Sequence, residues 1–305
     1  MKYTLHQLQV FLEVVNQKSV TKASEELFLT QPAVSIQLKK FQDQFPLPLT
    51  EVIGRKLYIT PFGEEIAEAA RNILKEASTI QYKTKQYQGK LAGKLSISVV
   101  STGKYLMPYY LSDFVNNHPE IDFKMDVTNK QKVVRDLEEN KTDFALVSVL
   151  PNHLELEKLP LLKNSLYLVG ASERVNNFKT NVKAIFENEP LLYREGGSAT
   201  RNAMEVFIKG RNYPVSKKIE LTSNEALKQA VIAGLGYSIM PLIGIKNAID
   251  QGDISIIPYK GLPINTQWNL VWLKNKKLTI VADAFLSHLK KEKETIKEKF
   301  FDWID

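Results

Sequence analysis

The spacing of hydrophobic residues predicts short helices at the start of the chain. Leu5, Leu8, Leu12 and Val15 recur at helical intervals, which predicts a first helix over about 5–17. Ser19 and Thr21 are residues that often cap helices, and a second helix is expected over about 21–28. The first 30 residues are therefore helical and contain no strand pattern.

A third helix is predicted over about 31–44. Thr30 can cap it, and proline at position 32 is tolerated because N–H groups in a first turn have no intrahelical acceptor. The expected buried stripe is Val34, Leu38, Phe41 and Phe45. The opposite face then carries Pro32, Ile36, Lys39, Lys40 and Asp43.

The segment 52–60 is predicted to form a wing. Gly54-Arg55-Lys56 separates two short strand-like pieces, of which Leu57-Tyr58-Ile59 is the clearer. Three helices followed by a wing make a winged helix-turn-helix, whose third helix enters the major groove of DNA. A small helical packing module without a DNA role is the alternative at this point.

A long helix is predicted from residue 62 to about residue 87. Its hydrophobic seam follows alternating steps of four and three residues, which is a heptad repeat. A seam this narrow favours pairing with the same helix of a second chain, whereas packing within its own domain is the alternative. The seam consists of Ile66, Ala70, Ile73, Ala77, Ile80, Thr84 and Tyr87.

After Gly93 the pattern changes to strands that alternate with helices. Strands are predicted at 95–100, 123–127 and 143–149, with helices between them, and this βαβαβ order predicts a mostly parallel sheet. Further strands are expected at 166–170, 190–193, 218–221, 237–240 and 269–273, and further helices at about 199–209, 224–233 and 278–300. The fold class is therefore α/β beyond residue 90.

Composition narrows the possible functions. The chain has 305 residues, of which 44% are hydrophobic and 25% charged, as in ordinary globular proteins. The formal charge of +7 is compatible with a polyanionic partner, yet residues 1–60 hold seven basic and five acidic residues, a net charge of only +2. Charge alone therefore does not establish nucleic-acid binding.

The chain has no cysteine and only four scattered histidines, so thiol chemistry and cysteine zinc sites are excluded and no metal or cofactor is expected. The N-terminus lacks a signal-peptide pattern, and no apolar run approaches the length of a membrane span. We therefore expect a cytoplasmic protein with no membrane partner.

The first 63 residues resemble the DNA-binding domain of LysR-type transcriptional regulators. The resemblance rests on Leu8 and Phe11, on Ser-Val-Thr-Lys-Ala-Ser-Glu-Glu-Leu over 19–27, on Thr-Gln-Pro-Ala-Val-Ser over 30–35, and on Gly-Arg-Lys-Leu-Tyr-Ile-Thr-Pro over 54–61 with Gly63. It implies a winged helix-turn-helix over 1–61, a dimerising linker helix over 62–90, and a two-lobed effector domain like a periplasmic binding protein over 91–305. Lobe I would span about 91–163 and 266–305, and lobe II about 164–265.

The side chains expected to contact DNA lie on the third helix and the wing. Gln31 can pair with adenine, Ser35 can reach a base or a phosphate, and lysine and arginine side chains suit phosphates. The full set is Thr30, Gln31, Pro32, Ser35, Lys39, Arg55 and Lys56.

Three positions depart from the family pattern. Ile36 stands where the family usually has arginine, and Thr50 and Val52 replace the usual phenylalanine and arginine before the wing. Loss of two arginines should weaken phosphate contacts and the salt dependence of DNA binding. An isoleucine at position 36 can contact a thymine methyl group instead.

The effector site is predicted where strands of the second region meet helices. Ligands of open α/β sheets bind at the carboxyl ends of strands, where free N–H groups of helix N-termini favour an anion. Each such residue could instead be only a helix cap. The resemblance places the effector between the lobes and favours Ser101, Thr102, Ser198 and Thr200, while Ser148 and Ser223 remain candidates.

Two arginines of the same region have two possible roles. Arg194 and Arg201 could bind an acidic ligand, or they could pair with Glu195 and Glu205. We favour the second interpretation. Similarly, we expect Phe300, Phe301 and Trp303 to anchor the C-terminus to its lobe.

The chain is thus interpreted as a LysR-type regulator that binds double-stranded promoter DNA. A small-molecule effector, expected to be anionic, would control it, and it would form a homodimer or homotetramer through the linker helix and the effector domain. The alternatives are an α/β enzyme, for which no catalytic cluster is found, and a solute-binding module, which would leave residues 1–60 unexplained.

Overall fold

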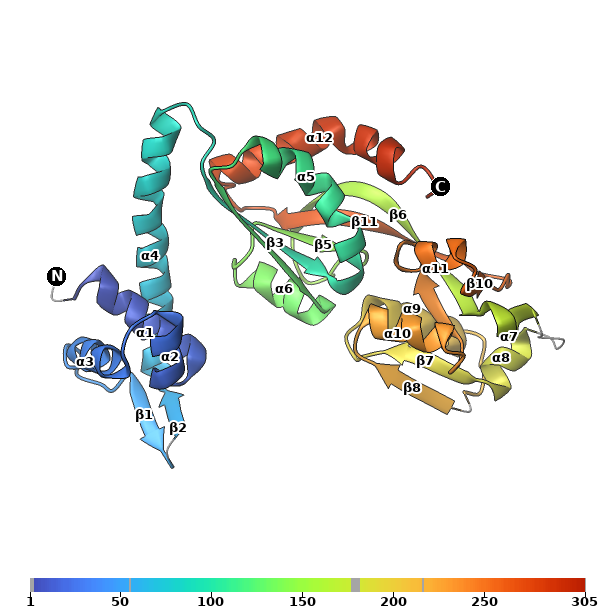
Figure 1. The fold of residues 1–305 in the computed structure, drawn as a ribbon, viewed down its shortest axis with the longest axis horizontal. Coiled ribbons are helices and arrows are strands. Elements are labelled where there is room, and N and C mark those ends of the chain that lie inside the picture. The colour runs from blue at the N-terminus through green and yellow to red at the C-terminus, as the bar shows by residue number, and fades with distance from the viewer. Residues whose placement is uncertain (1–2, 55, 177–181, 216, 305) are drawn as a thin grey trace. The chain divides into compact units, whose positions relative to one another are not determined.

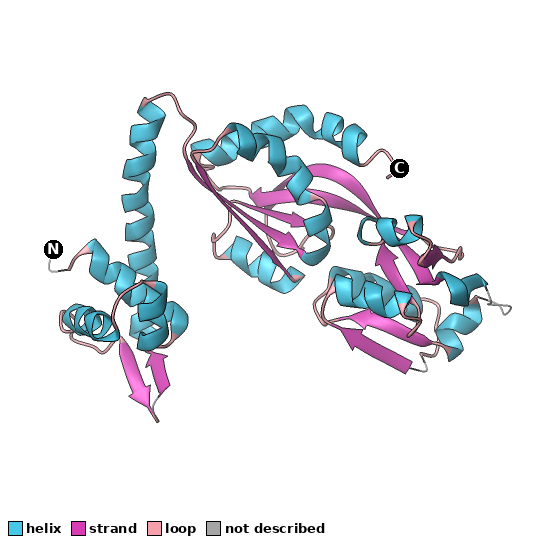
Figure 2. Cartoon of the chain, in the orientation of Figure 1, coloured by secondary structure: helices cyan, strands magenta, loops and turns pink. Residues whose placement is uncertain are grey.

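The computed structural model describes residues 3–54, 56–176, 182–215 and 217–304. The chain divides into two compact units, Met1–Lys90 and Leu91–Asp305. Figure 1 labels the elements, and Figure 2 shows that the first unit is mainly helical whereas the second mixes helices and strands.

The N-terminal unit contains three short helices, a two-stranded wing and one long helix. Its elements are α1 (Leu5–Gln17), α2 (Val20–Glu26), α3 (Gln31–Gln42), β1 (Thr50–Ile53), β2 (Lys56–Ile59) and α4 (Pro61–Tyr87). The predicted helices, wing and linker helix are confirmed, with ends that differ by one or two residues.

Local hydrogen bonds explain where these helices begin. The Thr4 hydroxyl accepts a hydrogen bond from the Gln7 backbone N–H, and the Gln7 side chain accepts one from the Thr4 N–H, which forms a capping box. The Thr60 hydroxyl accepts from the Gly63 N–H at 2.9 Å and donates to the Pro48 carbonyl at 2.7 Å, so it joins the start of α4 to the segment before the wing.

The predicted stripe of α3 packs into the core of this unit. Val34, Leu38 and Phe41 are buried, and Phe45 packs against them from the next turn of the chain. Ala67 and Ala70 add the first turns of α4 to the same core. The opposite face of α3 is exposed to solvent, as expected.

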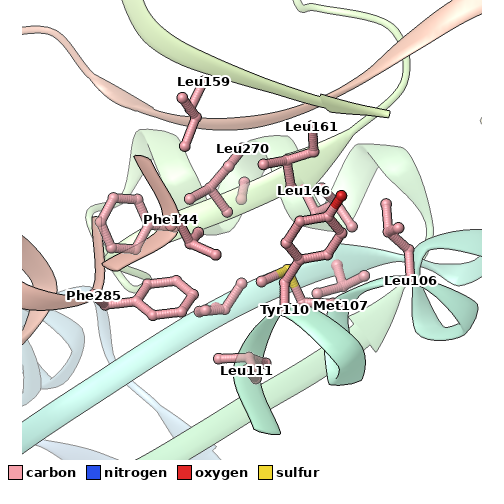
Figure 3. Packing of buried hydrophobic residues seen from close by; sticks show 14 of the residues in the cluster. Leu106, Met107, Tyr110, Leu111, Phe144, Leu146, Leu159, Leu161, Leu270 and Phe285 are labelled. Carbon is pink, nitrogen blue, oxygen red and sulfur yellow. The ribbon is translucent and has the colours of Figure 1, made fainter. Parts of the chain in front are cut away.

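The first lobe of the C-terminal unit, which we call lobe I, forms around one hydrophobic core. It comprises β3 (Gly93–Val100), the 3₁₀ turn η1 (Ser101–Tyr105), α5 (Met107–Asn117), β4 (Ile121–Thr128), α6 (Lys130–Glu138), β5 (Phe144–Val147) and the C-terminal α12 (Ile280–Phe300). Figure 3 shows Phe144, Phe285, Tyr110 and Met107 packed together in this core. Phe301 is buried there as well, and Trp303 packs beside it, so the expected anchoring of the C-terminus is confirmed.

Lobe II has two cores of its own. It contains α7 (Ser172–Asn176), α8 (Lys183–Asn188), β7 (Pro190–Arg194), α9 (Ala199–Lys209), β8 (Lys217–Leu221), α10 (Asn224–Ile232), β9 (Ser238–Pro241), η2 (Leu242–Gly244), α11 (Lys246–Asp250) and β10 (Ile254–Ile256). The hydrophobic pattern did not predict α7, α8, α11 and β10, which are short.

Two long strands join the lobes. β6 (Leu156–Ala171) and β11 (Ile264–Leu273) pair antiparallel from Leu156↔Leu273 to Leu166↔Ile264 and pass side by side from one lobe to the other (Figure 1). At the passage the paired side chains are polar: Asn164 donates to Thr266 at 2.9 Å, and Ser165 donates to Asn265 at 2.8 Å.

The prediction of a mostly parallel sheet is wrong. The main sheet has the order β10-β6-β11-β5-β3-β4, and β9 also pairs with β6. Only β3–β4 and β3–β5 are parallel within it, and the separate pair β7–β8 is parallel too. The βαβαβ pattern ends at β5; β6 then leads into lobe II and β11 returns from it, so these two strands run in opposite directions and pair antiparallel.

Candidate functional site

The exposed face of α3 carries the predicted polar side chains of the N-terminal unit. Thr30 caps the helix, and its hydroxyl accepts from the Ala33 N–H at 3.4 Å. Gln31 donates through Nε2 to the Ser35 hydroxyl at 2.8 Å on the exposed side. Pro32 and Lys39 are exposed on the same helix. Hydrogen-bonding groups and a cation thus lie together on one helix face.

The wing adds a second exposed surface. Lys56 is exposed at the start of β2, which pairs antiparallel with β1 from Thr50↔Ile59 to Ile53↔Lys56. Arg55, which we also predicted to contact DNA, lies outside the described residues. Gly54 has a φ of +55°, which suits the tight turn at the tip.

The three departures from the family pattern have different surroundings. Thr50 donates to the Gln42 side chain at 2.6 Å, so it joins the wing to α3. Val52 and Ile36 are 72% and 53% exposed. The two positions at which arginine was expected therefore present aliphatic side chains to solvent.

A small cavity lies between the two lobes of the C-terminal unit. Its volume is about 10 Å³, close to the space that one water needs. Ser101 and Thr102 line it from lobe I, and Ser198 and Thr200 line it from lobe II. These are the four residues that the resemblance favoured for the effector site.

Two helices begin at this cavity. Ser198 caps α9, and its hydroxyl accepts from the Arg201 N–H at 3.4 Å. Asn129 caps α6, and its side-chain oxygen accepts from the Lys132 N–H at 2.9 Å. In the first turn of each helix the backbone N–H groups have no intrahelical acceptor, and the helix dipole is positive at that end. Both features favour an anion at these helix starts.

Asn129 and Lys130 line the cavity but were not among the predicted site residues. The sequence pattern could have indicated them, because they stand between the strand 121–128 and the helix 130–138. The other candidates lie at strand-to-helix junctions of the same kind. Partial burial lowers the pKa of Lys130. Among the described residues no acidic side chain is seen in an ion pair with Lys130.

Ser101 links the lobes by hydrogen bonds. Its hydroxyl oxygen accepts from Arg194 Nη2 at 3.1 Å and from Asn224 Nδ2 at 3.0 Å, and both donors belong to lobe II. The oxygen thereby uses both lone pairs as acceptors, which leaves its O–H free to donate toward an anion.

The two arginines of lobe II pair with acids, as we favoured. The buried Arg194 side chain donates to both carboxylate oxygens of Glu195 at 2.8 Å. Arg201 pairs with Glu205 at 2.8 Å and with Glu220 at 2.6 Å. Arg194 and Glu195 nevertheless line the cavity, so this ion pair borders the space between the lobes.

Two further contacts hold the lobes together. Tyr105 donates to Glu225 at 3.1 Å, and burial together with this carboxylate raises the pKa of Tyr105 to about 12. Gly197 has a φ of +83°, and a Cβ there would lie 2.9 Å from Gln131 Cδ of α6. The backbone conformation therefore favours glycine, whereas an added Cβ would require only the exposed Gln131 side chain to shift.

Ser148 and Ser223 lie apart from the residues that line the small cavity. Ser148 is half-buried beyond the end of β5, and its neighbour Val149 lines a larger, mainly apolar cavity of about 450 Å³. Lys130 and Ala199 line both cavities, which are therefore adjacent. Ser223 is exposed and caps α10, accepting from the Ala226 N–H at 3.0 Å.

Other kinds of site find little support within the described part of the chain. Over those residues, no group of three histidine or acidic side chains is arranged to hold a metal ion. None of the helices seen there has the length and apolar character needed to cross a membrane.

Two family models match the chain and together cover both units. Residues 5–64 match the bacterial regulatory helix-turn-helix protein model of the lysR family, and residues 88–294 match the LysR substrate binding domain. The first match contains α3 and the wing, and the second contains lobe II and lobe I up to residue 294.

Curated relatives match over nearly their whole length. The chain is 35% identical to the HTH-type transcriptional activator CmpR of Synechocystis sp. over 94% of both chains. It is 34% identical to the RuBisCO operon transcriptional regulator of Allochromatium vinosum, over 93% of this chain and 95% of that protein.

Solved structures share the fold. The regulatory domain of Synechocystis PCC6803 CcmR in complex with 2-PG is 29% identical, with a TM-score of 0.60 over 65% of this chain and 95% of that one. Full-length CbnR complexed with its target DNA is 21% identical, with a TM-score of 0.70 over 94% of this chain and 99% of that one.

Proposed function

The chain belongs to the LysR family of transcriptional regulators, and on this premise we propose that a small anion bound between its two lobes controls its binding to promoter DNA. The proposed organisation is a DNA-binding domain over 1–61, a linker helix over 62–90 and an effector domain over 91–305. Lobe I of that domain comprises about 91–163 and 266–305, and lobe II about 164–265. A role on promoter DNA implies a cytoplasmic location.

The proposed DNA contacts use the exposed face of α3 and the wing. Gln31 and Ser35 would meet base edges in the major groove, because they lie near the N-terminus of the helix that this fold inserts there. Lys39, Arg55 and Lys56 would contact phosphates, while Thr30 and Pro32 shape the first turn. CbnR, which shares the fold, is seen in complex with its target DNA.

The proposed effector contacts use the small cavity between the lobes. Ser101, Thr102, Ser198 and Thr200 offer hydroxyl groups, two helices begin there, and Lys130 supplies a cation. Hydroxyls, helix N-termini and a partly buried lysine together favour a small anion. The CcmR regulatory domain binds 2-PG, an anionic effector, which supports the same class of ligand here.

The interlobe bonds suggest how an anion would act. Arg194 and Asn224 reach Ser101 across the lobes, and Glu225 accepts from Tyr105. The cavity of this arrangement has room for about one water, so an anion such as sulfate or 2-PG would widen it and shift the population toward a different arrangement of the lobes. We expect this shift to alter how pairs of DNA-binding units are spaced in the oligomer.

The linker helix is the proposed contact between copies of the chain. Its heptad seam leaves Ile73, Ile80 and Tyr87 exposed by 36%, 68% and 96%. A second copy of the same seam would remove this apolar surface from water. The homodimer or homotetramer would be completed by contacts of the effector domain.

We propose no catalytic role. The curated relatives are transcriptional regulators, and the most contacted hydroxyl of the cavity, that of Ser101, has an arginine and an asparagine as partners. Neither group is a general base at neutral pH, so the geometry suits binding.

The observation that carries the proposal is the convergence of hydroxyls from both lobes with Lys130 on one cavity. It is tested by thermal shift of the full-length chain against phosphate, sulfate, nitrate, small carboxylates and 2-PG. At least one anion should raise the melting temperature, and the Lys130→Met variant should lose the shift. Equal shifts in Lys130→Met and the wild type would contradict the proposed site.

A further inference from the structure

We infer that Ile36 determines operator specificity by contacting the methyl group of a thymine in the major groove. This inference rests on the proposed DNA-binding function and adds one base contact to it. The Ile36 side chain does not belong to the hydrophobic core of the N-terminal unit.

Ile36 lies on the exposed face of α3. It is 53% exposed, whereas Val34 and Leu38 on either side of it in sequence are buried in the core of the unit. Ile36 is not among the partly buried side chains that pack against this core. Its apolar surface therefore remains available to a partner, and its removal from water would favour binding.

The surroundings of Ile36 are polar and basic. Gln31 and Ser35 precede it on the same helix and are joined by a hydrogen bond of 2.8 Å, and Lys39 and Lys40 follow it within about one turn. A basic face is complementary to a polyanion and would repel the same face of a second copy. Charge thus favours DNA as the occupant of this surface.

The chemistry of the side chain selects the base. In the major groove only thymine presents a methyl group, and an aliphatic side chain has no donor or acceptor with which to recognise the other bases. Among Gln31, Ser35 and Ile36, only Ile36 can therefore distinguish thymine through its methyl group. We expect one thymine per half-site to depend on it.

Replacement of thymine by uracil tests the inference, because uracil keeps the hydrogen-bonding edge and lacks the methyl group. The operator is first mapped by footprinting of the full-length chain on its own upstream DNA. Each thymine of a half-site is then replaced in turn, in both half-sites together, and Kd is measured. At one position the wild type should lose about fourfold per half-site, or roughly fifteenfold in all, which corresponds to burial of one methyl group.

Three variants assign the effect to the side chain. Ile36→Ala should bind thymine and uracil operators equally at that position, whereas Ile36→Val should keep most of the discrimination. Leu47→Ala is the matched control, since Leu47 is 55% exposed in the same unit but lies outside α3, and it should discriminate as the wild type does.

The inference is overturned if no thymine shows this sensitivity, if Ile36→Ala retains it, or if Leu47→Ala loses it. Each of these results leaves the proposed DNA binding intact, since all the chains still bind the unmodified operator. Absence of any footprint by the wild type would instead contradict the proposed function.

Discussion

The Arg194 guanidinium of lobe II donates a hydrogen bond of 3.1 Å to the Ser101 hydroxyl of lobe I. Arg194 also pairs with Glu195, and Ser101 also accepts from Asn224. A buried ion pair on one lobe is thus connected to a hydroxyl that faces the small cavity from the other. Under the proposed function, Ser101 would couple anion binding directly to the contact between the lobes.

We predict that Ser101→Ala lowers the affinity for the effector anion by about tenfold, because a hydrogen bond to a charged group is lost. Calorimetric titration of the full-length chain measures the change. Ser223→Ala is the control: Ser223 caps α10 outside the cavity lining, so its loss should lower stability by about 1 kcal/mol and leave affinity unchanged. Similar losses of affinity in both variants would contradict this assignment.

The pH dependence of anion binding should report Lys130. Burial lowers its pKa, so its charge is lost at a lower pH than that of an ordinary lysine. The charged form attracts the anion, and affinity for sulfate should therefore fall as pH approaches the ordinary lysine pKa of about 10.4 from below. The affinity of the Lys130→Arg variant for sulfate should not change over this range, because a guanidinium stays charged. Lys94→Arg, changed at an exposed position on β3, should follow the wild type.

Gly197→Ala should weaken both folding stability and anion binding. The positive φ costs an alanine about 1–2 kcal/mol, and the new Cβ would meet Gln131 of the other lobe. Gly196→Ala is a matched control, because a Cβ there meets no atom within 4 Å. Urea unfolding and anion titration of both variants check the prediction, which fails if the two substitutions have equal effects.

Arginine at position 52 should steepen the salt dependence of DNA binding. Val52 is 72% exposed on β1, where the family resemblance leads us to expect arginine. Each added phosphate contact should raise the slope of log Kd against log salt by about one. Val206→Arg adds the same charge at a residue of the C-terminal unit that is also 72% exposed, and it should leave the slope unchanged.

Ile80→Glu should weaken self-association. Ile80 is 68% exposed on the heptad seam of α4, and a buried isoleucine pair would be replaced by two like charges. Sedimentation equilibrium should show a rise of about tenfold or more in the dissociation constant. Lys75→Glu lies on the far side of the same helix and should associate like the wild type. A dimer that Ile80→Glu leaves intact would place the contact elsewhere.

The sequence predicts the N-terminal unit well because each element there has a local signal. Thr30 caps α3, its hydrophobic stripe has a clear helical period, and Gly54 stands at the turn of the wing. Such signals depend on neighbours within a few residues. The same holds for β5, where a continuous apolar run marks a buried strand, and for β3, whose apolar and β-branched residues mark one although Ser96 and Ser98 lie among them.

The strand pairing in the sheet of the second unit could not be predicted from such local signals. The pairing of β6 with β11 joins residues about a hundred positions apart, and no local pattern records whether such strands run parallel or antiparallel. The hydrophobic pattern predicted only residues 166–170 of β6. The strand passes between the lobes, since Leu156–Leu161 lies in lobe I and Leu166–Ala171 in lobe II. A strand that changes its surroundings midway has no single burial period.

The candidate site was likewise predicted only in part from the sequence. Hydroxyl residues at strand-to-helix junctions were found from the chain, and Asn129 and Lys130 stand at the same kind of junction. That α6 and α9 begin at one cavity follows only from the tertiary structure. The interlobe partners of Ser101 follow from tertiary contacts as well. Arg194 could be foreseen as a partner of Glu195, its sequence neighbour, but not as a donor to Ser101.

The most direct test of control by an anion is footprinting of the full-length chain on its upstream DNA, with and without the anion that gives the largest thermal shift. We predict that the wild type protects different half-site positions when the anion is saturating, and that Ser101→Ala needs about tenfold more anion to show the same change. Identical wild-type footprints with and without the bound anion would contradict the account.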